Sequence, residues 1–348
     1  MAINVTDQLT TINEKVNSAD IPTGLREDIL TRTSQLTNLV ESSTFLPEFD
    51  RLVSYVEWVV SLPWNKKSQD VLDLVRAKEI LDSNHYGLDE IKERVLEYMS
   101  VMKLNTENKE NIAHAPILCF VGLVGTGKTT IAKSIADAMG RKFVRIPFGG
   151  MGDPLDLRGQ SRMHPEAEPG KVIKAVKLAG TRNPVILLDE IDRVTDEGKS
   201  SIMGVLVELL DPQQNYAFVD HYIDYPFDLS EALFIATANN TLRISTAVLD
   251  RLEPIMMPSY TDNEKMVIGQ KYIFPKVMKE SGVPENALTI QEDVWPSLVR
   301  PLGFDGGIRT LQRTIEGVVR KAAKEVVEGK TDRIVITKDN VKDYLPQL

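Results

Sequence analysis

Residues 122–130, GLVGTGKTT, decide the fold of this 348-residue chain. They satisfy the pattern G-x-x-x-x-G-K-[ST], in which a glycine-rich loop aims backbone N–H groups at phosphate oxygens. The pattern carries meaning only between a strand and a helix. Here it directly follows the apolar run PILCFV (116–121), and a helical pattern begins near Lys128. Both flanks therefore favour a phosphate-binding loop over a glycine-rich turn that carries a surface lysine.

The residues of this loop have separate expected roles. The glycines let the backbone curl tightly, and the positive end of the following helix attracts phosphate. Lys128 is expected to neutralise the terminal phosphates of ATP, and the Thr129 hydroxyl to bind Mg²⁺. The predicted nucleotide-binding residues of the loop are Gly122, Gly125, Thr126, Gly127, Lys128, Thr129 and Thr130. The predicted cofactors are therefore ATP and Mg²⁺.

A second motif, VILLDEID (185–192), is an apolar run that ends in two carboxylates. Asp189 is expected to hold Mg²⁺, often through water, and Glu190 to polarise the attacking water. Taken alone, the motif better fits an ordinary strand followed by a solvated acidic turn. Its place downstream of the phosphate loop favours a role in hydrolysis.

Short apolar runs alternate with helical segments between residues 116 and 258. The predicted strands are 116–121, 143–148, 185–189, 233–238 and 254–258. Such alternation predicts a parallel sheet with helices on both faces. Ligands of open sheets of this kind bind at the carboxyl ends of the strands, which is where both motifs lie.

The segments on both sides of this region have helical periodicity. Residues 1–62 are expected to be helical, with Pro63 as the interruption, and a second helix is expected over 88–104. The polar run 105–115 predicts a linker. Towards the end of the chain, one helical stripe is formed by Ile308, Leu311, Ile315, Val318, Val319, Ala322 and Val326. A short strand at 333–337 and a small helix beginning near Thr337 are expected to follow.

The composition excludes several classes of protein. Apolar residues make up 42% of the chain, enough to form buried cores, and the net charge of −9 argues against a nucleic-acid binder. The single cysteine, Cys119, favours a cytosol-like compartment. No signal peptide and no membrane-spanning run are predicted, and the four histidines lack metal-ligand spacing.

Over nearly its whole length the sequence resembles the Lon family of ATP-dependent proteases. The segments that carry this resemblance are YVEWVVSLPW (55–64), HYGLDEIKERVLEYMSV (85–101), GRKFVRIPFGGMGD (140–153), LLDPQQNYAFVDHYI (209–223) and VLDRLEPIMMPSYT (248–261). The resemblance implies an α/β P-loop AAA+ module with a parallel sheet, preceded by a helical segment and followed by a helical lid domain. The expected domains are 1–84, 85–260 and 261–348.

The resemblance also implies roles for four residues outside the two motifs. Asn239 matches the sensor that orients the hydrolytic water, and Tyr86 matches a position beside the adenine. Arg251 matches an arginine finger that enters the neighbouring subunit's site, and Arg309 matches a lid arginine that reaches the phosphates. On spacing alone, Asn239 could cap a helix and the two arginines could form surface ion pairs. A finger that acts in trans implies a homo-oligomer, and for Lon-like modules a homo-hexamer.

Two departures from the family bear on function. The first is that the proteolytic domain with its serine–lysine dyad, which follows the lid in Lon, has no counterpart before the end at DYLPQL (343–348). The globular region that precedes the helices in Lon has no counterpart either. This chain alone is therefore not expected to cut peptides. It is either an ATPase-only relative or the ATPase fragment of a complete ATP-dependent serine protease.

The second departure lies in residues 158–171, RGQSRMHPEAEPGK, which align with the Lon loop that grips the substrate polypeptide. The family places an aromatic residue, an aliphatic residue and a glycine there. This chain offers Met163, His164, Pro165 and Glu166, and Glu168 follows. Histidine gives less apolar contact than an aromatic residue, and carboxylates are costly to desolvate. A ring of these segments is expected to line the channel with negative charge.

The leading hypothesis is a Mg²⁺-dependent Lon-like AAA+ ATPase of protein quality control. It would remodel or unfold proteins in the cytoplasm, or in the host cytoplasm if the source is viral. The alternative is a nucleotide-binding interaction protein that modulates a Lon-type or other protease ring. A nucleic-acid motor is disfavoured by the acidic charge and by the match to Lon helices. The sequence does not identify the protein substrate or partner.

Overall fold

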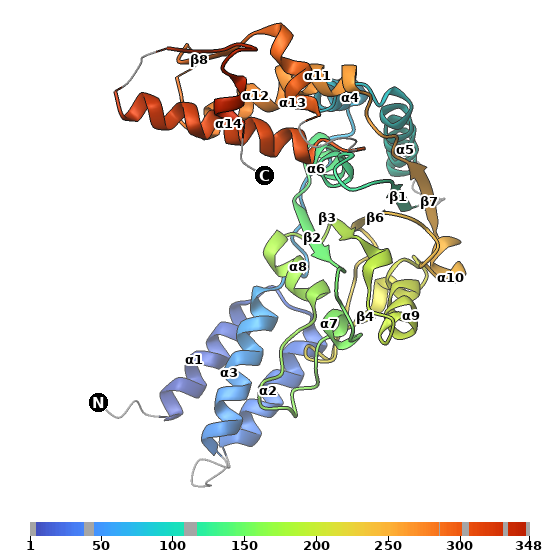
Figure 1. The fold of residues 1–348 in the computed structure, drawn as a ribbon. Coiled ribbons are helices and arrows are strands. Elements are labelled where there is room, and N and C mark those ends of the chain that lie inside the picture. The colour runs from blue at the N-terminus through green and yellow to red at the C-terminus, as the bar shows by residue number, and fades with distance from the viewer. Residues whose placement is uncertain are drawn as a thin grey trace. The chain divides into compact units, whose positions relative to one another are not determined.

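The computed structural model describes residues 5–37, 45–107, 117–284, 286–300, 306–329 and 333–345. Contacts divide the chain into two compact units (Figure 1). The first unit consists of Met1–Leu72, Met102–Cys119 and Ala136–Pro254, and the second of Asp73–Val101, Phe120–Ile135 and Ile255–Leu348. The three domains expected along the sequence stay a prediction.

Three helices open the first unit: α1 (Val5–Ser18), α2 (Thr23–Thr37) and α3 (Phe45–Ser61). They pack against one another (Figure 1). The helical spacing of α3 buries Leu52, Val56 and Val59 on one face. Helix α3 ends at Ser61, two residues before Pro63, as expected for a residue that cannot continue a helix. Helical structure is thus confirmed for most of 1–62, except at 19–22 and 62, which are described and not helical. Residues 1–4 and 38–44 lie outside the described residues.

A five-stranded sheet has the order β2-β3-β6-β1-β7. Its strands are β1 (Ile117–Val121), β2 (Phe143–Pro147), β3 (Val185–Asp189), β6 (Leu233–Ala238) and β7 (Leu252–Met256). Strand β3 pairs in parallel with β2 and with β6. Every residue of β3 and β6 is buried, which explains why their sequences are apolar except for Asp189 and Thr237. The parallel sheet predicted from sequence is confirmed.

The predicted strand 254–258 and the predicted linker 105–115 have different boundaries in the structure. Strand β7 begins at Leu252, so Pro254 is its third residue and not its first. Proline is tolerated there because β7 is an edge strand, and backbone N–H groups on its outer side have no neighbouring strand to bind. Helix α5 (Asp89–Glu107) continues through the first three residues of the expected linker, because nothing at 105–107 breaks a helix. The rest of the linker, 108–115, and Pro116 lie outside the described residues.

Smaller elements complete the first unit. Helix α8 packs against β2, and α7 packs against α8 and α9. A two-stranded antiparallel ribbon is formed by β4 and β5. These elements are α7 (Leu155–Arg158), α8 (Lys171–Ala179), η1 (Ile191–Arg193), α9 (Lys199–Leu209), η2 (Asn215–Ala217), β4 (Phe218–Val219), β5 (Pro226–Phe227) and α10 (Thr246–Leu249).

The second unit contains α4 (Leu74–Asn84), most of α5, the first turns of α6 (Lys128–Met139) and a helical region after β7. The elements of that region are α11 (Asp262–Ile268), η3 (Gly269–Ile273), α12 (Phe274–Glu280), β8 (Leu288–Ile290), η4 (Glu292–Val294), α13 (Trp295–Val299), α14 (Arg309–Val327), β9 (Ile334–Ile336) and α15 (Val341–Tyr344). Strand β8, which sequence periodicity missed, pairs in parallel with β9.

Helix α14 supplies the long apolar stripe expected from its spacing. Five of its positions are buried in the core of the second unit, namely Leu311, Ile315, Val318, Val319 and Ala322. Ile308 and Val326 pack against the same core and are partly buried. The small helix expected near Thr337 begins later, at Val341. Across the described part of the chain, no helix combines the length and the apolarity that a bilayer crossing requires.

Candidate functional site

The loop 122–130 of the second unit connects β1 to α6. Gly125 and Gly127 have φ angles of 85° and 95°, a region that residues with a Cβ rarely adopt. The buried Thr126 donates its hydroxyl to the Leu123 carbonyl over 2.9 Å, which ties the loop to itself. The loop therefore has the tight, inward-curled backbone that a phosphate group requires.

Lys128, the first residue of α6, is 7% exposed. Its ammonium group donates to the carbonyls of Gly122 and Leu123 over 2.5 and 2.9 Å, so its charge is held within the curl of the loop. Thr129 follows at the second position of α6 and is partly exposed. The Thr130 hydroxyl instead turns back to the Gly127 carbonyl over 2.8 Å.

The lid approaches the loop from within the same unit. The Ile308 N–H donates to the Gly125 carbonyl over 3.0 Å, and the Tyr260 hydroxyl donates to the Thr126 carbonyl over 3.1 Å. Burial, with Glu264 nearby, raises the pKa of Tyr260 to about 12, so its hydroxyl stays a donor. Arg309 begins α14 directly after Ile308, and a Cβ built on Gly125 would lie 3.3 Å from its Cγ. The structure thus places Arg309 beside the phosphate loop, while its role stays a prediction.

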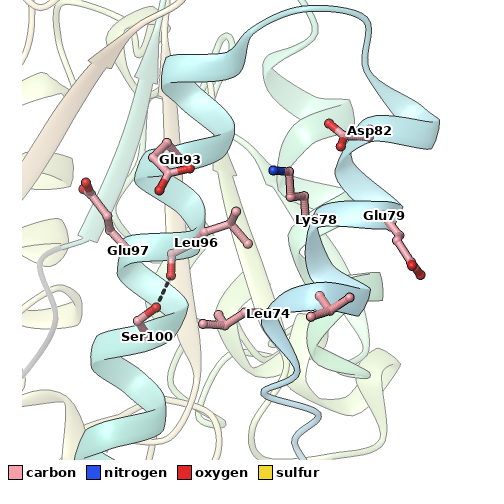
Figure 2. Close-up of a pocket in the computed structure, with 9 residues that line it drawn as sticks. Leu74, Lys78, Glu79, Asp82, Glu93, Leu96, Glu97 and Ser100 are labelled. Carbon is pink, nitrogen blue, oxygen red and sulfur yellow. Dashed lines mark hydrogen bonds between the residues drawn. The ribbon is translucent and has the colours of Figure 1, made fainter.

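Helices α4 and α5 frame the turn that carries Tyr86. A groove of about 470 Å³ lies between them, and in Figure 2 Leu74 and Leu96 point into it from opposite walls. The Lys92 ammonium of α5 lies 2.7 Å from the Asp82 carboxylate of α4 and joins the two helices. Tyr86 itself is 36% exposed. Its ring stands edge-on to that of Tyr272, with 6.5 Å between the ring centres. An exposed aromatic face suits stacking on a base, but the adenine contact stays a prediction.

His85, which sequence reasoning passed over, ties this turn to the helix that follows the phosphate loop. Its Nε2 lies 2.9 Å from the Ser134 hydroxyl of α6, and the Asn84 amide donates to the same hydroxyl over 3.0 Å. Burial, followed by the charge of Lys92, lowers the pKa of His85 to about 4, although a hydrogen bond with the Thr130 backbone opposes the shift. His85 is therefore neutral at physiological pH.

The two predicted acidic residues lie in the first unit at the end of β3. Asp189 is 5% exposed, and its two oxygens have different partners. Oδ2 accepts from Arg145 Nε over 2.6 Å, and Oδ1 accepts from the Thr237 hydroxyl. Because Pro147 of β2 is opposite Asp189, Arg145 lies two residues back on the same face of the sheet. The buried carboxylate is thus held in one orientation.

Glu190 adopts a left-handed conformation, with φ 58° and ψ 49°, which costs a residue other than glycine about 1–2 kcal/mol. Its N–H donates to the Thr237 hydroxyl over 2.9 Å. Its carboxylate lies 3.9 Å from the Arg193 guanidinium. Strained backbone of this kind concentrates at functional sites, where the surrounding structure holds it in place.

Asn239 follows β6 directly and lines a cavity of about 340 Å³ in the first unit. The other residues that line it are Asp192, Arg193, Val194, Asn240 and Arg243. Strands β3 and β6 are neighbours in the sheet, so Asn239 emerges at the same edge as Glu190. That position agrees with a residue that orients water, a role that stays a prediction.

Arg251 forms an ion pair within its own chain. Its Nη2 lies 2.9 Å from the Asp211 carboxylate, and its Nη1 donates to the Ala247 carbonyl over 2.8 Å. The hydrogen bond from Arg251 lowers the pKa of Asp211. The single chain therefore contains an ion pair of Arg251, which is the alternative that spacing alone allowed. A role in a neighbouring subunit's site would require Arg251 to leave Asp211, and that role stays a prediction.

A buried carboxylate holds the segment 158–171 near its C-terminal end. The carboxylate of Asp220, which has no solvent exposure, accepts N–H bonds from Gly170, Tyr222 and Ile223 over 2.7, 2.8 and 3.1 Å. Met163 is 84% exposed at the outer part of the segment. Glu168 lies 2.5 Å from Lys174, which offsets part of the negative charge expected there.

The chemistry of these side chains fits Mg²⁺. No cluster of three or more histidine, cysteine, aspartate or glutamate side chains that could hold a metal occurs in the described ranges. Mg²⁺ in nucleotide sites needs no such cluster, because phosphate oxygens and water fill most of its coordination positions. A threonine hydroxyl and one carboxylate are the usual protein contribution, and the binding of Mg²⁺ by Thr129 and Asp189 stays a prediction.

Comparisons with known proteins agree with this geometry. Residues 118–260 match the ATPase family associated with various cellular activities (AAA), and residues 279–335 match the Lon protease AAA+ ATPase lid domain. The chain is 42% identical to the Lon protease of Lawsonia intracellularis over 344 residues. It is 41% identical to Lon protease 2 of Thermus thermophilus over 338 residues, and 40% identical to Lon protease 1 of Bacillus subtilis over 340.

These alignments cover 99%, 95% and 98% of this chain but only 40%, 42% and 43% of the three relatives. The chain thus spans about two fifths of the length of the curated relatives it matches. The phosphate loop and the acidic pair at the end of β3 lie inside the AAA match, and α13 and α14 lie inside the lid match. This chain contains the AAA+ ATPase module and the lid domain of the Lon protease family.

Proposed function

We propose that this chain hydrolyses Mg²⁺-bound ATP and uses the energy to remodel or unfold proteins. The observation that carries the proposal is the acidic pair Asp189 and Glu190, both bound to the Thr237 hydroxyl. The pair ends a strand of the same sheet as β1, which leads into the phosphate loop. An acidic turn without function would not need a strained residue beside a buried carboxylate.

The proposed roles follow from the chemistry of each group. The loop backbone and Lys128 bind the phosphates, and Thr129 and Asp189 hold Mg²⁺, directly or through water. The metal, when bound, neutralises charge that develops on the phosphate oxygens. Glu190 polarises the attacking water and Asn239 orients it.

The proposal includes a homo-oligomeric ring, with six members by analogy to the family. In such a ring Arg251 acts on the nucleotide of the neighbouring subunit, and fingers of this kind contribute roughly 10³–10⁵ in rate. Specific ATPase activity should then rise with protein concentration. Full activity in a dilute monomer would contradict this part of the proposal. The proposed location is the cytoplasm, consistent with a single buried cysteine.

Glu190→Gln tests the hydrolytic part. The substitution keeps the size of the side chain but removes the base, so turnover should fall by about 10²–10⁴ while ATP still binds. Turnover of the wild type should also increase when an unfolded protein is added. Unchanged turnover in the variant would refute the proposed catalytic role.

The contacts of the segment 158–171 favour a second candidate function. The Arg162 guanidinium stacks on the Tyr55 ring at 4.0 Å, and Lys174 pairs with Glu168, so the segment is tied to the rest of the first unit at these two points. A segment held in this way suits a protein that joins or modulates a Lon-type or other protease ring. Turnover insensitive to unfolded protein, with a protease that co-purifies, would support that function. If the reading frame continues past Leu348, the chain is the ATPase part of a complete serine protease.

A further inference from the structure

Thr237 is the one polar residue of β6, whose sequence is LFIATA, and it has no solvent exposure. A buried hydroxyl is unfavourable unless hydrogen bonds replace its contacts with water. Here two bonds do so: the Glu190 N–H donates to the hydroxyl oxygen, and the hydroxyl donates to Asp189 Oδ1. The direction of the hydroxyl is therefore fixed, because one lone pair faces an N–H and the proton faces a carboxylate.

The two bonds act on both acidic residues at once. Thr237 holds Oδ1 of Asp189 while Arg145 holds Oδ2, so the carboxylate cannot rotate freely. The bond to the Glu190 N–H holds the backbone of a residue that otherwise disfavours its left-handed conformation. The direction in which the Glu190 side chain leaves β3 depends on that backbone conformation.

We infer that Thr237 is a positioning residue for ATP hydrolysis, which sets Asp189 for the metal and Glu190 for the water through one hydroxyl group. The inference rests on the proposed function, because it assigns Thr237 to the same site. Thr237 contacts neither the nucleotide nor the water in this role. It acts through the Asp189 carboxylate and the Glu190 backbone. Its contribution belongs to the hydrolytic step and not to phosphate binding, which the loop 122–130 provides.

The test compares Thr237→Val, which keeps the shape but loses the hydroxyl, with Thr237→Ser, which keeps the hydroxyl. Thr33→Val is the matched control, because Thr33 is 1% exposed and donates its hydroxyl to the Ile29 carbonyl of α2, outside the site. Four quantities are measured: kcat, KM, the melting temperature, and the Kd of a fluorescent ATP analogue at increasing Mg²⁺ concentrations.

For Thr237→Val we expect kcat to fall about 100-fold, since a misplacement of about 1 Å at a reacting group has that effect. The Kd measured without Mg²⁺ should stay within about twofold of wild type, because the loop is unchanged. The Mg²⁺ concentration needed for half of the metal-dependent gain in affinity should rise. Thr237→Ser should restore kcat to within about threefold, and Thr33→Val should leave kcat unchanged.

A Thr237→Val protein with wild-type kcat and wild-type Mg²⁺ dependence would overturn the inference. Equal losses in Thr237→Val and Thr237→Ser would overturn it too, because the hydroxyl would then not be the cause. If Thr237→Val does not fold, Thr237→Ala is judged by the same criteria. If the wild type does not hydrolyse ATP at all, the proposed function fails. The Mg²⁺-dependent affinity then decides the role of Thr237 by itself.

Discussion

His85 makes the stability of the second unit depend on pH. Its pKa is lowered from 6.5 to about 4 by burial and by Lys92. In the unfolded chain the side chain takes up a proton as the pH falls below about 6.5, whereas the folded chain resists protonation until about pH 4. The stabilisation is therefore fully present above pH 6.5 and is lost as the pH falls from 6.5 towards 4. The full loss is about 3.4 kcal/mol, from 1.36 kcal/mol for each of about 2.5 pKa units.

The perturbation is His85→Gln, whose amide can replace Nε2 in the contact with Ser134 but does not titrate near neutral pH. Between about pH 8 and about pH 5.5, protonation of the unfolded chain at His85 should lower the free energy of unfolding of the wild type by about 1.4 kcal/mol. Other groups titrate equally in both proteins. The wild type should therefore lose about 1.4 kcal/mol more than the variant over this interval.

The assay is urea unfolding followed by circular dichroism at the two pH values. Asn84→Ala is the control, because it removes the neighbouring bond to the Ser134 hydroxyl without removing a titratable group. It should lower stability equally at both pH values and keep the wild-type pH dependence. If His85→Gln shows the same pH dependence as the wild type, the reasoning about the buried neutral histidine is refuted.

Three further predictions concern the first unit. Asp70→Ala removes the carboxylate that accepts from Arg141 Nε and Nη2 over 2.7 and 2.6 Å, and the Arg141 side chain is only 6% exposed. Unfolding in urea should show a loss of about 3 kcal/mol, and a loss below about 1 kcal/mol would contradict the burial argument. Arg251→Ala should bind the ATP analogue with wild-type Kd but hydrolyse ATP at least about 10²-fold more slowly, and wild-type turnover would remove the finger role. Asp220→Asn weakens the bond to the Gly170 N–H, so glutamate-specific proteolysis within 158–171 should accelerate, and an unchanged rate would show that Asp220 does not hold this segment.

The local parts of the site could be predicted from sequence because their geometry is local. The phosphate loop needs only nine consecutive residues between a strand and a helix, and its glycines have the positive φ angles that the motif implies. Strands β3 and β6 were recognisable because they are buried on both faces and so are apolar except for Asp189 and Thr237. The prediction was wrong at β7, because its position at the edge of the sheet allows a proline inside the strand. It was also wrong at the end of α5, because the polar residues 105–107 continue the helix.

The partners of the predicted residues could not be predicted in the same way. Thr237 is 48 residues from Asp189 in sequence, and Arg145 is 44 residues away. A single polar residue in LFIATA was a usable signal, since a buried strand rarely includes a hydroxyl without a hydrogen bond. Arg145 and Asp211 gave no such signal, because charged residues in those contexts are normally exposed to solvent.

The sequence by itself determined that this chain carries a phosphate loop, an acidic pair at the end of a strand, and the segments of a Lon-type module with its lid. These features depend on residue types at short, fixed spacings, which a linear pattern records. Only the tertiary structure decided how the acidic residues are held, that Arg251 pairs with Asp211, and that His85 is buried and neutral. Those properties depend on burial and on contacts between residues tens of positions apart, which form only when the sheet and its helices pack.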